Sequence, residues 1–439
     1  MNLKKRNPRR IFKNNRGWLW LLASPLAVAR VAGMPGIIAT PTPPAIFAPP
    51  AMEDTLTNNS QQVFVPAGTV LRNGLPQPFQ FGPVTVRPHV DYSFIYGNGI
   101  QAALTNQQST VIQQISPGLL VDLGRHWSLD YTPTFRFYSS DQFKDGVDHA
   151  FSLIGGTDYE DWRFGLTQNF LYTTAPAAET GAQTEQETFG TGFSAARILN
   201  EKMSLNLGLN QNFSYADSLQ NSRGWSTSDG LNYELWPRMI VGAGVTAGYV
   251  NLDIGSDQTY EQINAQVNWR ATDKLSVQFS GGMEDRQYAA SSQPDSLTPV
   301  FSGSLQYQPF ADTQISVSGS RSVSPSLVPG SDTTATSFGA NISQTLFRKF
   351  TLNLGTSYNI SKFAQIALAV RELSPGWYQL YAENVGRTDD NIGFTARLSH
   401  PLLRRGTWSV FYQYADNQST VQAFSYRSSQ VGFDLSYRY

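Results

Sequence analysis

Histidine is the side chain best suited to acid–base chemistry near neutral pH, and this chain of 439 residues has only four: His89, His126, His149 and His400. His89 lies two residues before Asp91, a spacing that places both side chains on one face of an extended strand. Such a pair could orient a catalytic base, but no nucleophile or water-activating set accompanies it. The sequence therefore favours a protein that is not an enzyme.

Carboxylates in two stretches have the oxygen ligands that calcium prefers, but neither stretch has the spacing of a calcium-binding loop. The two sets are Asp253, Asp257 and Glu261, and Glu383, Asp389 and Asp390. We interpret both as solvated loop charge. Cysteine is absent, which excludes disulfides, thiolate zinc sites, thiol catalysis and a lipid-anchored cysteine. We expect no metal site and no cofactor.

The composition is unusual for a soluble protein. Charged residues make up 15% of the chain, against about 25% in typical soluble domains, and aromatic residues make up 13%. The hydrophobic share of 40% is too low for a bundle of transmembrane helices. These values suit a sheet with one apolar face, and nothing in them favours binding to nucleic acid.

The N-terminus has the pattern of a secretory signal peptide. Seven basic residues and no acidic residue precede the apolar stretch Gly17–Ala29, which ends in the small-residue pattern Ala27-Val28-Ala29. The alternative, an uncleaved anchor, would need about 20 apolar residues to span a bilayer. We therefore predict cleavage of residues 1–29, which leaves 25 basic and 33 acidic residues and a formal charge of −8.

A Pro-rich linker is predicted to follow, over residues 30–82. Residues 34–52 contain many Pro, Ala and Ile residues, so this part is expected to be extended and poorly ordered. We interpret the linker as a periplasmic spacer; the alternatives are a tether to a periplasmic partner and a plug that enters the following domain.

From Val84 to the end, apolar and polar residues alternate with the period of two that is typical of half-buried strands. In the segment 127–138, for example, Trp127, Leu129 and Tyr131 alternate with Ser128 and Asp130. Most segments have about the 9–11 residues that a tilted strand needs to cross a bilayer. Eighteen strands are predicted, at 84–96, 111–124, 127–138, 146–156, 162–173, 187–199, 203–215, 223–235, 239–251, 258–270, 274–286, 297–308, 313–322, 333–346, 350–361, 390–400, 407–416 and 426–439.

The connections between these segments alternate in length. Short turns such as 125–126 and 236–238 alternate with long connections, which include 97–110, 174–186, 287–296, 323–332 and 362–389. Short periplasmic turns, long extracellular loops and an even strand number are typical of transmembrane β-barrels. We predict an all-β fold, an antiparallel up-and-down barrel over residues 83–439. Residues 362–389 are compatible with an extracellular hairpin, a loop inside the pore or two more strands, so the range is sixteen to twenty.

Aromatic residues support this barrel. Five tryptophans lie next to short turns, as expected of an aromatic girdle at the periplasmic interface: Trp127, Trp162, Trp236, Trp269 and Trp408. The last strand presents one apolar row that ends at the chain terminus, formed by Val431, Phe433, Leu435, Tyr437 and Tyr439. Such a row resembles the C-terminal strand that the outer-membrane assembly machinery reads. We predict that it is the assembly signal and that it pairs with the first strand.

The polar rows should then line an aqueous lumen, because a charge that faces lipid near the midplane costs roughly 2–4 kcal/mol and eighteen strands are too many for side chains to fill the interior. The charged lining candidates are Arg87, Asp91, Asp122, Asp130, Arg136, Arg163, Arg270, Arg397, Asp434 and Arg438. They form either a transverse field or a network of salt bridges that stiffens the wall. The other lining residues are mostly amides, hydroxyls and glycine, which suits neutral polar solutes.

The opening strand Val84–Tyr96, the following Gly97-Asn98-Gly99 and the alternation up to Tyr439 resemble the β-barrel porin families of Gram-negative bacteria. Among these families, the chain resembles the barrels associated with exopolysaccharide export loci. The resemblance implies an outer-membrane channel for small polar solutes, or one that assists polysaccharide export, as a monomer or homotrimer with possible periplasmic export partners. The alternatives are a non-conducting adhesive barrel that acts through loop 362–389, an export component that docks through residues 34–60, and an outer-membrane enzyme.

Overall fold

The computed structural model describes most of the chain after the linker. The described residues are 79–103, 106–124, 126–177, 183–217, 219–289, 295–327, 332–363, 369–374, 377–381 and 386–439. The predicted signal peptide and most of the predicted linker lie outside them. Within these ranges, no helix is long and apolar enough to cross a membrane.

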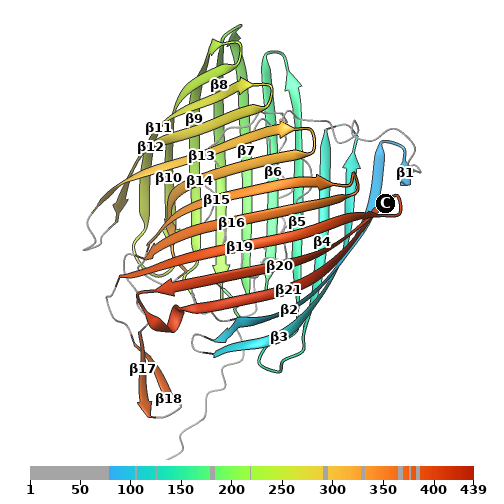
Figure 1. Ribbon diagram of the computed structural model, residues 1–439. Helices are drawn as coiled ribbons and strands as arrows, with labels where there is room; N and C mark the ends of the chain where they lie inside the picture. The colour runs from blue at the N-terminus through green and yellow to red at the C-terminus, as the bar shows by residue number, and fades with distance from the viewer. Residues whose placement is uncertain are drawn as a thin grey trace, which may run out of the picture.

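One antiparallel sheet forms a closed barrel (Figure 1). The sheet has nineteen strands. The short β1 (Phe79–Phe81) pairs with the beginning of β2. The other eighteen strands form the wall, which is closed because β2 pairs with β3 on one side and with β21 on the other. The wall strands are β2 (Val84–Ala103), β3 (Asn106–Leu123), β4 (Trp127–Tyr138), β5 (Gly146–Tyr159), β6 (Trp162–Thr173), β7 (Gln186–Asn200), β8 (Met203–Ala216), β9 (Ser222–Trp236), β10 (Met239–Leu252), β11 (Gln258–Thr272), β12 (Leu275–Tyr288), β13 (Ser296–Phe310), β14 (Thr313–Pro325), β15 (Asp332–Leu346), β16 (Phe350–Phe363), β19 (Arg387–Leu402), β20 (Gly406–Ser419) and β21 (Tyr426–Arg438).

The predicted fold class and strand number are confirmed. Each of the eighteen segments with two-residue alternation overlaps one wall strand, and consecutive strands pair throughout. Alternation determines this result because it gives every strand one apolar row for lipid and one polar row for the interior.

The long connection predicted at 97–110 is wrong. There β2 and β3 continue to pair, with Gly97 opposite Thr110 and Ile100 opposite Gln108, and register shifts lie between and beyond these pairs. Ile100 is fully buried, so the extension covers an apolar residue. Gly99, at φ +72°, lies so close to the backbone of Arg427 that a side chain there would collide with it. The Gly-Asn-Gly sequence therefore allows a bulge beside β21 and does not form a turn.

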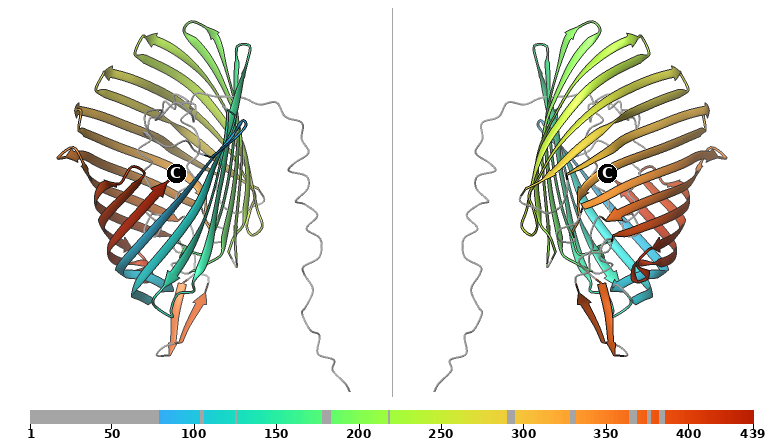
Figure 2. Two further views of the ribbon diagram at one scale, coloured as in Figure 1. Left: turned by 90° about the vertical axis from the view of Figure 1, so that its right-hand side faces the viewer. Right: turned by 90° about the vertical axis from the view of Figure 1, so that its left-hand side faces the viewer.

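Short and long connections lie at opposite ends of the barrel, as predicted. The segment predicted at 362–389 contains β17 (Ala369–Ser374) and β18 (Trp377–Tyr381), which pair only with each other. This two-stranded hairpin stands apart from the wall at the long-connection end (Figures 1 and 2). Of the three alternatives, the separate hairpin is the one observed, and it adds no strand to the wall.

The ends of the described chain meet at the short-turn end (Figure 1). Tyr439 donates its backbone N–H to the carbonyl of Pro88 at 2.9 Å, and its ring stacks on Phe79 with ring centroids 4.7 Å apart. The guanidinium of Arg405 lies 3.9 Å from the centroid of the Tyr439 ring. Short β1 therefore continues the edge that β21 leaves, and the terminal aromatic residue joins the two.

Candidate functional site: the inner wall of the barrel

The two faces of the wall are the reverse of those in a soluble protein. Large apolar side chains are exposed along the outer rows, and polar side chains are buried along the inner rows. In β21, for example, Val431, Phe433, Leu435 and Tyr437 are exposed, whereas Asp434 is only 8% exposed. Since apolar side chains face lipid in a membrane barrel, the buried polar rows define the lumen.

The charges of β19, β21, β2 and β3 form ion pairs on the inner face. Arg87 contacts Asp122 at 2.8 Å, and Arg397 contacts Asp434 across β20. Asp434 also accepts a hydrogen bond from Ser93 at 2.7 Å. These contacts join strands from the two ends of the chain at the seam where the barrel closes. We call this part of the inner wall, β19–β21 and β2–β5, the ionic arc.

Next to the seam, His89 belongs to a chain of hydrogen bonds. Thr132 donates its hydroxyl proton to Asp130 at 2.8 Å, and His89 Nε2 lies 3.1 Å from the same hydroxyl oxygen. Because the hydroxyl has one proton, which Asp130 accepts, His89 acts as the donor and not as a base toward Thr132. Asp91 lies near His89 and accepts a hydrogen bond from Ser436. The geometry is that of a positioned polar wall and not of a nucleophile with its base.

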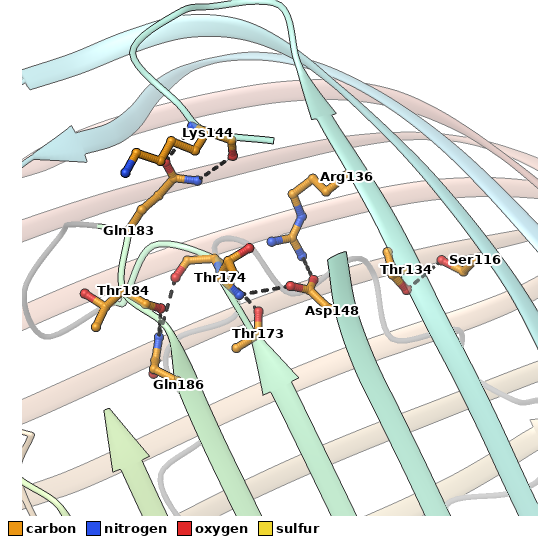
Figure 3. Close-up of polar contacts among 11 residues, drawn as sticks. Ser116, Thr134, Arg136, Lys144, Asp148, Thr173, Thr174, Gln183, Thr184 and Gln186 are labelled. Atoms are coloured by element: carbon orange, nitrogen blue, oxygen red, sulfur yellow. Dashed lines mark hydrogen bonds and ion pairs between the residues drawn. The ribbon is translucent and has the colours of Figure 1, made fainter. Parts of the chain in front are cut away.

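A second buried pair lies where β4 and β5 approach the long-connection end (Figure 3). Arg136 Nη2 contacts Asp148 Oδ2 at 2.5 Å, and the other Asp148 oxygen accepts the N–H of Thr174 at 3.0 Å. Above them, Gln183 exchanges hydrogen bonds with the backbone of Lys144, so the β4–β5 and β6–β7 connections are joined. Asp148 was not among the sequence candidates, although it alternates with Ala150 and Ser152 on the inner row of β5.

The remaining charged candidates lie near the short-turn end. Arg163 is about half exposed and lies 3.9 Å from Asp158, beside the β5–β6 turn. Arg270 is opposite Ser276 on the inner row, three residues from the β11–β12 turn, and Arg438 is opposite His89. The structure thus brings Arg87, Asp91, Asp122, Arg397, Asp434 and Arg438 together at the seam and leaves Arg163 and Arg270 apart. Their role in lining a channel stays a prediction.

The inner rows of β13–β16 carry no charged side chain over residues 302–308, 314–322, 333–345 and 351–359. They present hydroxyls, amides and glycine, paired across strands as Ser302 with Ser320, Ser318 with Gly339, and Asn341 with Gly355. Ser320 and Ser337 share a hydrogen bond of 2.8 Å. We call this region the neutral arc. It adjoins the ionic arc, because β16 pairs with β19.

The β14–β15 end turns into the lumen, which the sequence did not indicate. β13 pairs with β14 only from Phe301 onward, although it pairs with β12 from Ser296. Beyond that point β14 and β15 continue together as far as Pro325 opposite Asp332. The connection reaches the β8–β9 loop, where Gln220 donates to the carbonyls of Leu327 and Ser326 at 2.9 and 3.0 Å.

A buried polar cluster holds this inturned hairpin against β11 and β12. Asp332 accepts hydrogen bonds from Gln258 at 2.8 Å and from Tyr288 at 2.5 Å. Arg286, 2% exposed, donates to Gln258, Glu284 and the carbonyl of Val323. Glu284 and Arg286 follow Ser280 and Gly282 on the inner row of β12, so their alternation was the available signal. Asp332, the first residue of β15, lies in the segment 323–332 that was predicted as a connection, and a connection has no periodicity.

Two further groups narrow the long-connection end. Arg387 is 2% exposed, pairs with Asp389 at 3.0 Å, and lies between the rings of Phe363 and Phe424 at 3.9 and 3.8 Å. Phe143 of the β4–β5 connection packs against an apolar cluster on the inner wall, formed by Ile95, Ile100, Ile112, Phe411 and Tyr138. Connections from three parts of the chain therefore pack inside this end of the barrel.

A family model described as putative beta-barrel porin 2 matches residues 77–439, which include β1 and the whole wall. The chain belongs to this family. It is a porin-like β-barrel of the outer membrane.

Solved porin structures resemble this porin-like barrel at low sequence identity. Acinetobacter baumannii OccAB3 matches with a TM-score of 0.42 and 10% identity over 81% of this chain and 99% of that chain. Pseudomonas aeruginosa OpdO gives 0.42 and 11%, over 81% and 97%. Pseudomonas aeruginosa OccK2 (OpdF) gives 0.43 and 10%, over 80% and 97%. A search of curated proteins found no match.

The predicted girdle tryptophans of this porin-like barrel gather at one end of the wall. Trp127, Trp162, Trp236, Trp269 and Trp408 lie at the short-turn ends of their strands, with Trp236 and Trp269 exposed at 59% and 45%. His149 and His400 are on the outer face, where His149 Nδ1 lies 2.9 Å from the hydroxyl of Tyr131 and His400 packs between Phe350 and Trp408. The girdle and assembly roles stay predictions.

Four of the six carboxylates in the two sets have protein partners. Asp253 accepts hydrogen bonds from Asn221, and Asp257 from Tyr249, Asn251 and Leu252. The Tyr249 hydroxyl, more than the other donors, lowers the pKa of the Asp257 carboxyl below its usual value. Asp389 pairs with Arg387 inside the barrel, whereas Asp390 accepts from Tyr358 on the outer face. Glu383 lies outside the described residues, which contain no metal-binding cluster of three or more such side chains.

Proposed function

We propose that this barrel is a passive channel for small polar solutes. The observation that carries the proposal is the closed eighteen-strand wall whose neutral arc offers hydroxyl and amide groups to a water-filled lumen. Such groups exchange hydrogen bonds with water and with sugars at nearly equal free energy, so a solute of this kind crosses without strong binding. The ionic arc is paired, so it gives the lumen little net field.

The inturned β14–β15 hairpin supports a size limit. It lies within the wall and is held by Asp332, Arg286 and Gln220. Since the packed connections occupy part of the long-connection end, small solutes pass and large polymers do not in the arrangement described. Assistance to polysaccharide export would need the packed connections to move out of the long-connection end, so that a polymer could pass along the same wall.

The test is conductance and liposome swelling with the refolded mature chain. We expect discrete channel openings in planar bilayers, and swelling rates that fall steeply from monosaccharides to trisaccharides. The channel proposal would be contradicted if the mature chain showed no conductance and if neither of two deletion variants, one without residues 364–386 and one without residues 30–78, showed any. Swelling that does not depend on solute size would contradict the size limit alone. Unchanged exopolysaccharide secretion in a deletion strain would exclude the export role.

A second candidate function, adhesion, is favoured by the β17–β18 hairpin, which stands apart from the wall (Figure 2). Deletion of residues 364–386 should then abolish binding of cells to surfaces while conductance persists. Unchanged binding would exclude this role for the hairpin.

Export through a cleaved signal peptide completes the proposal. We expect the mature protein to begin at Arg30, after Ala27-Val28-Ala29. Residues 30–78 then act as a periplasmic spacer, and insertion uses the assembly machinery. Mass spectrometry of the mature N-terminus tests the cleavage position, and retention of residues 1–29 in the outer-membrane fraction would contradict it.

A further inference from the structure

Polar side chains interrupt the apolar outer face on four adjacent strands. Gln168 of β6 lies opposite Thr191 of β7, which lies opposite Gln211 of β8. Thr227 and Asp229 follow on β9. These residues share the outer rows with exposed apolar residues, because Gln211 alternates with Leu209, exposed at 57%, and Asp229 alternates with Leu231, exposed at 42%. We call these five residues the polar belt.

The belt lies at one level of the membrane. Counted from the short-turn ends of their strands, Gln168 is six residues from Trp162 and Asp229 is seven from Trp236. Thr191, Gln211 and Thr227 are nine, eight and nine residues from the corresponding ends. Trp162 and Trp236 mark the interface below, and Trp225, stacked on Tyr249, marks the aromatic zone above. The belt therefore lies in the apolar zone between them.

A carboxylate at this level is costly in lipid. Asp229 lies opposite Leu207 and Val245, and among the described residues it accepts a hydrogen bond from the neighbouring Thr227 at 3.2 Å. On the other wall strands the outer rows at this level hold apolar or aromatic residues, glycine and proline, apart from Arg321, Thr356 and Ser429, which lie on three different strands. Thr356 donates to the carbonyl of Gly393 within its own wall. Only β6–β9 carry a contiguous belt.

We propose that the polar belt is the interface of a homodimer with a two-fold axis along the membrane normal. Such an axis places the same patch of two copies face to face and reverses the strand order, so that β6 of one copy faces β9 of the other. Gln168 and Asp229 lie at the two ends of the belt and at the same level. Gln168 of each copy is then opposite Asp229 of the other copy, which gives two such pairs.

The chemistry of the two ends fits this arrangement. The amide of Gln168 supplies N–H donors, and the carboxylate of Asp229 accepts hydrogen bonds only. Thr191 and Gln211, on the two central strands, lie nearest the axis. Thr191 donates its hydroxyl proton to Gln168 of its own wall at 2.6 Å and can accept from a partner, whereas the amide of Gln211 can both donate and accept. The outer strands of the belt are three strand spacings apart, roughly 14 Å, which two adjacent barrels can cover with long side chains. The partner that the belt fits is therefore a second copy of this chain.

Site-directed cross-linking tests the interface directly, because the chain has no cysteine. Thr191→Cys and Gln211→Cys should each give a disulfide-linked dimer when outer membranes are treated with an oxidant. Thr356→Cys is the matched control, since it lies on the outer row of β16 six residues from the short-turn end, and it should stay monomeric. Absence of the dimer at both belt positions, equal cross-linking at Thr356→Cys, or cross-linking to a different protein would each overturn the proposal.

Exchange of the two end residues tests the complementarity. Gln168→Asp places two carboxylates opposite each other at both ends, and we expect the dimer to weaken about tenfold or more, the effect of losing two hydrogen bonds within a bilayer. The double variant Gln168→Asp/Asp229→Gln restores one donor and one acceptor at each end and should recover the dimer. Heat-modifiable migration on gels confirms that each variant is a folded barrel. An unaffected dimer in the single variant, or no recovery in the folded double variant, would contradict the proposal.

Discussion

Arg136 and Asp148 illustrate how single residues are held in this wall. Their side chains are 3% and 10% exposed, so each charge depends on the other for its solvation. The ion pair Arg163–Asp158 has the same chemistry but side chains that are 51% and 48% exposed. A buried pair is costly to break because one charge is left without a partner, whereas water replaces the partner of an exposed charge.

Asp148→Asn should therefore destabilise the barrel by roughly 3 kcal/mol. Asp158→Asn is the matched control and should cost less than about 1 kcal/mol. Urea unfolding in lipid vesicles, followed by tryptophan fluorescence, measures both. Equal effects of the two substitutions would contradict the difference in burial.

Gly118 gives a second test at the residue scale. A Cβ at this position would lie 2.0 Å from His89 Nε2 and 2.6 Å from Thr132 Oγ1, so Gly118→Ala must displace the histidine from its hydrogen bond. We expect a loss of about 1–3 kcal/mol in the same unfolding measurement. Gly190→Ala is the control, because nothing lies within 4 Å of its added Cβ, and it should be neutral or slightly stabilising. A loss at Gly190 as large as that at Gly118 would contradict this account.

Among the elements, β21 and the β14–β15 hairpin have distinct tasks. β21 pairs with β20 and β2 and closes the wall, and its last residue, Tyr439, contacts Pro88, Phe79 and Arg405. The hairpin leaves β13 and folds into the lumen. An open edge exposes unpaired backbone groups, which cannot be tolerated in lipid, so the loss of β21 affects assembly itself.

Deletion of Tyr437–Tyr439 should leave the protein unassembled in the periplasm. Tyr439→Phe keeps the stacked ring and should insert normally, whereas Tyr439→Ala should insert more slowly. Cell fractionation and heat-modifiable migration measure the outcome. Normal insertion of the deletion variant would count against β21 as the assembly signal.

Asp332→Ala should release the inturned hairpin from the wall. It removes the acceptor of Gln258 and Tyr288, so the hairpin loses two of its hydrogen bonds to β11 and β12 and keeps that of Arg286 with Val323. We expect a larger single-channel conductance and faster uptake of trisaccharides. Asp312→Ala, at an exposed short turn, is the control and should conduct like the wild type. A smaller conductance after Asp332→Ala would contradict the hairpin's narrowing role.

At the scale of the whole molecule, the lumen has an ionic arc and a neutral arc. The pairs Arg87–Asp122, Arg136–Asp148 and Arg397–Asp434 cancel locally, as a stiffening network of salt bridges would. The alternative reading of these charges, a transverse field, needs opposite signs on facing walls, whereas each of these pairs joins opposite signs within the same arc of the wall. This arrangement favours the network.

We therefore expect weak ion selectivity in the wild-type channel. Arg397→Gln leaves Asp434 uncompensated and should shift the reversal potential toward cations; Asp434→Asn should shift it toward anions. The double variant should return close to the wild type. Reversal potentials in a tenfold salt gradient measure these shifts. No shift in either single variant would show that the pair does not face the conduction path.

The sequence by itself determined the wall. Alternation located all eighteen strands, because in a membrane barrel each strand needs an apolar row for lipid, and that need is local to the strand. It also placed Arg87, Asp122, Arg397 and Asp434 on inner rows. Where the local signal was a turn pattern, as at Gly97-Asn98-Gly99, the prediction of a loop was wrong, because the long-range contact of Gly99 with Arg427 converts the pattern into a bulge.

Only the tertiary structure decided what the wall encloses and what it presents to a partner. Asp332 joins Tyr288, and Gln220 joins Ser326, across more than 40 and 100 residues of chain, and connections have no period from which such contacts can be inferred. The polar belt likewise becomes a single surface only when the register of four strands brings Gln168 and Asp229 to one level. The alternation of residues shows which face of the wall each side chain occupies, whereas its contacts across the barrel depend on how the strands pair and the connections fold.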